Sequence, residues 1–126
     1  MLGTYPVFGF VATTDAQRAR TFYEQVLGLR FVEDTPFVQV FDANGIMIRV
    51  TPVPGHKPLP HTVLGWRVPD IDAAARALAE KGVVFERFPG MTQDALGIWT
   101  SPDGNRVAWF KDPDGNLLSL TQFIVA

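Results

Sequence analysis

The sequence has no cysteine among its 126 residues. This absence excludes disulfide bonds, thiolate metal sites and a cysteine nucleophile together. Histidine is scarce as well, since His56 and His61 are the only two and both lie in a proline-rich segment. Two histidines in such a segment are more typical of solvent-exposed side chains than of metal ligands. The sequence therefore offers little for thiol or transition-metal chemistry.

An excess of one charge and a long apolar run are absent too. Charged residues make up 19% of the sequence and the net charge is −2, so no basic surface for nucleic acid or membranes is expected. No apolar stretch approaches the roughly 20 residues that span a bilayer, and the first residues lack the pattern of a signal peptide. We therefore expect a cytoplasmic protein without nucleic-acid or membrane partners. Hydrophobic residues, at 47%, suffice for the core of one domain.

The same pattern of strand, helix and hairpin occurs twice along the chain. Asp15 and Asp70 each follow a short apolar strand pattern, and each is expected to cap the helix that begins there. Gly28 and Gly82 are expected to end these helices, because glycine takes a positive φ at little cost. Such a repeat predicts a single domain of two alike modules around a shared cleft. The modules are expected at about 6–52 and 62–124, joined by a proline-rich linker at 52–61.

The apolar spacing places the individual elements. It predicts the order βαβββ twice, an α+β class, with a cup-shaped mixed sheet and the helices on its outer face. The buried helix stripes are expected to be Ala19, Phe22, Tyr23, Val26 and Leu27, and then Ile71, Ala74, Ala75 and Leu78. A loop is expected from residue 89 to about 97. Strands are expected at 7–13, 29–33, 37–42 and 46–51, and then at 62–68, 83–88, 106–111 and 116–123.

Strand alternation sorts the side chains between the two faces of each sheet. We expect a three-residue hairpin loop with Gly115 in a left-handed conformation, and the same register around Asn44 and Gly45. The expected helix-facing set is Trp66 and the pairs Val40–Ile48, Val38–Val50, Ala108–Leu120 and Phe110–Leu118. The expected pairs on the opposite face are Gln39–Arg49, Phe41–Met47, Phe37–Thr51, Trp109–Ser119 and Val107–Thr121.

The face away from the helices is predicted to line the cleft. It is mostly apolar and aromatic with a few polar groups, which is the usual composition of small-molecule pockets. An arginine in that setting, Arg49, favours an anionic or carbonyl-bearing ligand. The same side chains are equally typical of aromatics that pack on one another or of a dimer interface. The predicted lining is Phe8, Phe10, Phe37, Gln39, Phe41, Met47, Arg49, Val63, Arg67, Trp109, Ser119 and Thr121.

Three segments resemble the vicinal oxygen chelate superfamily, which includes glyoxalase I, bleomycin-resistance proteins and extradiol dioxygenases. They are Thr21–Leu29, Val68–Ala74 and Phe110–Leu118, which read TFYEQVLGL, VPDIDAA and FKDPDGNLL. Together with the doubled βαβββ order they cover nearly the whole chain. These motifs are made of turn and packing residues, so the resemblance implies the fold rather than a reaction.

The resemblance also implies where a metal would be held. In the metal-dependent members, histidine or glutamate ligands occupy cleft-facing positions that correspond here to Phe8, Arg49, Val63 and Ser119. None is a usual ligand for a divalent ion, and arginine is a fixed cation. We therefore expect no metal or other cofactor.

Two functions remain open at this point. The first is a metal-independent small-molecule-binding protein like the non-catalytic, drug-sequestering branch, for which the resemblance implies a homodimer and planar ligands. Its aromatic walls would be Phe8, Phe10, Phe37, Phe41 and Trp109, with polar contacts from Gln39, Arg49 and Ser119. The second is a lyase, isomerase or dioxygenase with an atypical site, although Ser119 lacks an evident histidine partner as a nucleophile.

Overall fold

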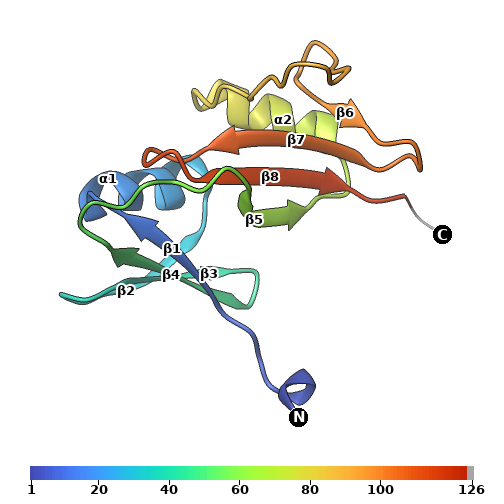
Figure 1. Ribbon diagram of the computed structural model, residues 1–126. Coiled ribbons are helices and arrows are strands. Elements are labelled where there is room, and N and C mark those ends of the chain that lie inside the picture. The colour runs from blue at the N-terminus through green and yellow to red at the C-terminus, as the bar shows by residue number, and fades with distance from the viewer. Residues whose placement is uncertain (125–126) are drawn as a thin grey trace. The chain divides into compact units, whose positions relative to one another are not determined.

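The computed structural model describes residues 1–124 of the chain, which divides into two compact units, Met1–Pro58 and Leu59–Ala126. The boundary falls within the proline-rich segment 52–61. Each unit contains a four-stranded mixed sheet and a helix, in the order βαβββ (Figure 1). The α+β class and the two repeated modules are therefore confirmed, while a single domain around one cleft stays a prediction. None of the helices in residues 1–124 has the length and apolar character of a membrane span.

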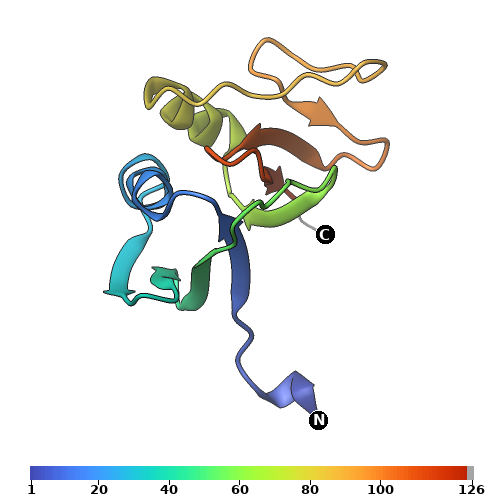
Figure 2. The ribbon, with the colours of Figure 1, turned by 60° about the vertical axis from the view of Figure 1, so that its left-hand side comes forward.

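The first unit is built on a sheet with the strand order β1-β4-β3-β2. The edge strand β1 runs parallel to β4, and the other neighbours are antiparallel. A short helix, η1, stands apart from this sheet in two views (Figures 1 and 2). The elements are η1 Leu2–Thr4, β1 Gly9–Thr13, α1 Ala16–Arg20, η2 Thr21–Val26, β2 Arg30–Asp34, β3 Gln39–Ala43 and β4 Ile46–Pro52.

The helix predicted after Asp15 is present, but it changes type along its length. The Asp15 carboxylate accepts a hydrogen bond from the Arg18 N–H at 3.1 Å, which is the predicted cap. The second half, η2, is a π-helix, in which the Leu27 N–H donates to the Phe22 carbonyl five residues back at 2.9 Å. Gly28 then takes a φ of 75°, as expected for the residue that ends the helix.

The β3–β4 hairpin has a two-residue turn, so the expected three-residue loop is wrong here. Asn44 and Gly45 both have positive φ, 51° and 90°, as a type I′ turn requires, and asparagine tolerates that conformation better than most residues. The pairing is shifted by one residue from the expected register. The observed pairs are Gln39–Val50, Val40–Arg49, Phe41–Ile48, Asp42–Met47 and Ala43–Ile46.

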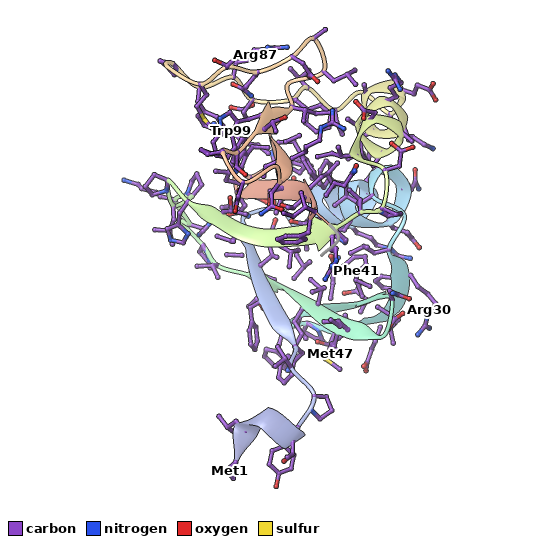
Figure 3. All side chains as sticks on the ribbon, turned by 90° about the vertical axis from the view of Figure 1, so that its right-hand side faces the viewer. Met1, Arg30, Phe41, Met47, Arg87 and Trp99 are labelled. Atoms are coloured by element: carbon purple, nitrogen blue, oxygen red, sulfur yellow. The ribbon has the colours of Figure 1, made fainter. Side chains whose placement is uncertain are left out.

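This shift moves two predicted cleft residues to the helix-covered face. Phe41 is fully buried, with its ring centroid 6.0 Å from that of Tyr23, and it lies between sheet and helix (Figure 3). Gln39 is buried on the same face, beside Val50. The expected pairs Gln39–Arg49, Phe41–Met47, Val40–Ile48 and Val38–Val50 are therefore wrong. The pair Phe37–Thr51 is absent as well, because β3 begins only at Gln39.

The second unit has the strand order β5-β8-β7-β6, with β5 parallel to β8. Its final hairpin has the predicted register: Trp109 pairs with Ser119. Pro113 holds its φ near −65° and cannot enter a type I′ turn, so the loop needs a third residue, Gly115, with φ 86°. The elements are β5 Thr62–Arg67, α2 Ile71–Glu80, β6 Trp99–Thr100, β7 Arg106–Lys111 and β8 Leu117–Gln122.

The helix face of this second sheet follows the sequence pattern. Trp66 stacks on the buried Phe110 with ring centroids 6.4 Å apart, and Ala75 of α2 is fully buried. The Asp70 carboxylate accepts from the Ala73 N–H at 3.1 Å and caps α2, as Asp15 caps α1. The two modules thus begin their helices with the same local chemistry.

The predicted strand at 83–88 is wrong, because this segment belongs to a loop that extends to Ile98. The Gln93 side chain organises the loop: its amide nitrogen donates to the carbonyls of Glu86 and Gly97, and its oxygen accepts from the Phe88 N–H. One side chain therefore satisfies backbone groups that a neighbouring strand would otherwise pair. Arg87, labelled in Figure 3, donates further hydrogen bonds to carbonyls at 93–95.

Candidate functional site

In the first unit, an apolar patch lies on the sheet face away from the helix. Phe10 and Arg49 are neighbours across the parallel pair β1–β4, and the Phe8 and Phe10 ring centroids are 5.3 Å apart. Phe8 is 45%, Phe10 61% and Met47 42% exposed. Four of the predicted lining residues therefore share this face. We call Phe8, Phe10, Met47 and Arg49 the aromatic face.

Arg49 is the polar group of the aromatic face. Its guanidinium carbon lies 5.9 Å from the ring centroids of both Phe8 and Phe10, within range of a cation–π interaction. Its Nε is buried and has no hydrogen-bond partner within residues 1–124. A buried donor without an acceptor costs about 1–3 kcal/mol. The position therefore favours the arrival of an acceptor oxygen.

In the second unit, the face away from the helix carries Trp109, Ser119, Thr121 and Arg67. Ser119 lies between Gly65 of β5 and Trp109 of β7, and it is largely buried. Trp109 is held by an edge contact with Phe88 at 5.4 Å and by Trp99 at 6.1 Å between centroids. Sequence reasoning missed Phe88, because it treated that residue as part of a strand rather than of a loop that folds back on Trp109.

The remaining predicted residues are less closely grouped. Phe37 is 81% exposed in the segment before β3. Val63 lies at an irregularity in the β5–β8 pairing, between Thr62 and Leu64. His61 is exposed. Within the described residues its ring forms one hydrogen bond, in which Nδ1 lies 3.2 Å from the carbonyl oxygen of the neighbouring Thr62. None of these residues therefore joins the aromatic face of the first unit or the group around Trp109 in the second.

The positions that would hold a metal in this kind of fold do not fit one. In the first unit they carry a phenyl ring and a guanidinium, from Phe8 and Arg49; in the second they carry an isopropyl group and a hydroxyl, from Val63 and Ser119. In the first unit Arg49 would repel a cation, and in the second unit Ser119 would offer it only one weak oxygen donor. Residues 1–124 contain no cluster of three or more histidine or acidic side chains that could hold a metal.

A bidentate ion pair joins α2 to β7 in the second unit. The Arg106 Nη1 and Nη2 atoms lie 2.6 and 3.1 Å from the two Asp72 carboxylate oxygens. The hydrogen bond from Arg106 lowers the pKa of Asp72, and the same bond raises the pKa of Arg106. Asp94 of the loop lies 3.8 Å from Arg106. This geometry fastens the loop and the helix to the sheet and has no evident catalytic role.

The fold and the sequence together define the class of protein. The model of the Glyoxalase/Bleomycin resistance protein/Dioxygenase superfamily matches residues 7–120. The chain belongs to this superfamily, as the resemblance of its motifs implied. No curated protein sequence matches the chain.

Solved structures share the fold over almost their whole length. A superfamily member from Sphaerobacter thermophilus is 25% identical, with a TM-score of 0.76, covering 98% of this chain and 100% of that one. The bleomycin resistance determinant encoded on transposon Tn5 is 22% identical, with a TM-score of 0.75 and coverages of 97% and 100%. Lactoylglutathione lyase from Agrobacterium tumefaciens is 17% identical, with a TM-score of 0.72 and coverages of 94% and 93%. At such identities the last two indicate the fold alone.

Proposed function

We propose that this protein is a metal-independent small-molecule-binding protein of the glyoxalase/bleomycin-resistance type, which takes a planar, anionic ligand. The observation that carries the proposal is Arg49, whose guanidinium lies beside Phe8 and Phe10 with an unpartnered Nε. The aromatic face combines exposed ring surface with one fixed positive charge. A planar anion matches both features at once.

Two kinds of interaction are expected to bind the ligand, aromatic stacking and a hydrogen bond to Arg49, and each can be removed separately by mutation. Stacking on an aromatic side chain contributes about 0.5–1.5 kcal/mol beyond area burial. A carboxylate accepting from Arg49 adds a charge-assisted hydrogen bond, which is shorter and stronger than a neutral one. Phe37 in the first unit, and Trp109, Ser119 and Thr121 in the second, remain proposed contacts. Arg67 is left out of this ligand's contacts because its guanidinium lies beside Phe123, in a hollow at the ends of β5 and β8. Gln39 and Phe41 are withdrawn from the set because they face the helix.

The metal-independent part of the proposal rests on the donor set. The four candidate positions supply no carboxylate and no imidazole, so the metal-assisted chemistry that polarises adjacent substrate oxygens finds no ligands there. The test is elemental analysis of protein purified without chelator or affinity tag. Well under one metal ion per chain is expected, whereas a stoichiometric transition metal would support the rival, an enzyme with an atypical site.

We further propose a homodimer and a cytoplasmic location. Exposed aromatic and aliphatic side chains on the first sheet, together with the edge strand β1, support self-association, and two-fold dimers are the commonest closed assembly. Light scattering coupled to gel filtration should give about twice the chain mass of 13.9 kDa. A monomer over a wide concentration range contradicts the dimer. The lack of cysteine accords with the location.

A further inference from the structure

A hollow lies at the ends of β5 and β8, in the second unit. These two strands are parallel, so their carboxyl ends lie together where the chain turns into α2 (Figure 1). The hollow has a volume of about 390 Å³, which falls within the roughly 300–1,000 Å³ range of small-molecule pockets. Its lining residues are Arg67, Val68, Pro69, Gln122 and Phe123.

Arg67 supplies the charge in this hollow. Its guanidinium carbon lies 5.1 Å from the Phe123 ring centroid, so the ring supports the guanidinium plane and leaves N–H groups for another partner. Among the described residues of the second unit, no acidic side chain forms an ion pair with Arg67. The nearby Asp70 carboxylate is engaged with the Ala73 N–H at the start of α2. The guanidinium therefore keeps its capacity to bind an anion.

Gln122 supplies a second donor whose orientation is determined. Its side-chain oxygen accepts a hydrogen bond from the Ile71 N–H at 2.9 Å. Only the oxygen of an amide can accept from an N–H group, so this bond fixes which side-chain atom is the nitrogen. The amide nitrogen makes no hydrogen bond within residues 1–124. The Gln122 side chain lines the hollow, so the two N–H groups of its amide are donors at this site.

We propose that this hollow binds an organic carboxylate, through residues other than those of the aromatic face. A guanidinium fork matches the two oxygens of a carboxylate, and the Gln122 amide adds a neutral donor. Val68, Pro69 and Phe123 provide apolar walls for the organic part of the ligand. Inorganic phosphate also offers anionic oxygens but gains nothing from those walls. The site takes carboxylates that carry an apolar or aromatic group.

The test is a titration of the ¹⁵N-labelled full chain at pH 7 with benzoate, benzamide and inorganic phosphate. The side-chain N–H signals of Arg67 and Gln122 should shift with benzoate and respond at least about tenfold more weakly to the other two. Arg67→Gln should weaken benzoate binding there by about tenfold or more. Gln122→Glu keeps an acceptor for the Ile71 N–H but replaces the donor by an anionic oxygen, so it should abolish binding without unfolding α2.

Arg30→Gln is the matched control, because it removes an exposed arginine that belongs to neither proposed site and should leave the Arg67 and Gln122 shifts unchanged. Three results overturn the proposal: no shift of either signal with benzoate, equal binding of benzamide or phosphate, or benzoate binding that survives both Arg67→Gln and Gln122→Glu. None of these results bears on Arg49, so the proposed function stands or fails separately. An unchanged thermal transition in Gln122→Glu shows that a loss of binding is not a loss of folding.

Discussion

A Cβ atom added at Gly65 would lie 2.9 Å from the Ser119 hydroxyl oxygen. Gly65 of β5 and Ser119 of β8 are paired across parallel strands, so the missing side chain leaves room for the hydroxyl. Gly65→Ala should destabilise the fold by about 1–3 kcal/mol through overpacking. Ser119→Ala removes the clashing atom and should reduce that penalty in the double variant, as measured by urea unfolding. Strictly additive effects would show that the two side chains do not compete for the space.

Phe41 and Phe10 should respond differently to truncation, although sequence reasoning placed both in one cleft. Phe41 is fully buried under the helix, whereas Phe10 is 61% exposed. Phe41→Ala should lower the free energy of unfolding by about 3–5 kcal/mol. Phe10→Ala should change it by about 0.5 kcal/mol or less. Chemical denaturation of the two variants measures this, and similar losses in both would contradict the observed β3–β4 register.

The Asp72–Arg106 pair predicts a loss of stability in acid. The hydrogen bond from Arg106 lowers the pKa of Asp72 in the folded state, so its contribution is present above the unfolded-state pKa of about 3.9 and disappears as the pH falls through the lower folded-state pKa. The stability difference between the native chain and Asp72→Asn should therefore be constant from neutral pH to about pH 5 and shrink below about pH 4. Both side chains are partly exposed, so high salt should also reduce the difference. A difference independent of pH would contradict this account.

Gln93 should control the order of the loop 83–98. Its side chain bonds the backbone of Glu86, Phe88 and Gly97, so Gln93→Leu should cost about 1–3 kcal/mol. Amide hydrogen exchange should accelerate most at the Phe88 N–H, which loses its acceptor. Thr92→Ala, at the exposed neighbouring position, is the matched control. Unchanged exchange at Phe88 in Gln93→Leu would mean that the loop is held by other contacts.

The sequence predicted the fold because its strongest signals are local. Asp15 and Asp70 cap helices through their own side chains, and Pro113 allows only the hairpin loop that was expected. Asn44 permits a tighter turn than Pro113 does. The sequence repeat did not indicate that the two hairpin loops differ in length. A register error of one residue moves every side chain of the paired strand to the other face. Gln39 and Phe41 were misplaced for that reason.

The candidate sites were harder to predict from the sequence, because they depend on contacts between residues that lie far apart in the chain. Alternation along β1 and β4 placed Phe10 and Arg49 correctly, since their own strands determine their faces. The loop was expected only from residue 89 to about 97, and its first part, 83–88, was wrongly predicted as a strand. Gln93 bonds the backbone of Glu86 and of Gly97, and no periodicity in the sequence records such bonds. The hollow beside Arg67 was also missed, because Gln122 is oriented by a bond to Ile71, 51 residues earlier in the chain.

The central claim is that Arg49 binds the anionic group of a planar ligand. The most direct measurement is calorimetric titration with 1-naphthoate and its neutral amide, in a chain that carries Arg67→Gln so that the hollow beside Arg67 does not contribute. Arg49→Gln should weaken 1-naphthoate binding by about tenfold or more and change the amide little. Arg30→Gln, at an exposed arginine of the same unit, should affect neither ligand. If 1-naphthoate fails to bind, or binds Arg49→Gln as tightly as the parent chain, the aromatic face is not the ligand site.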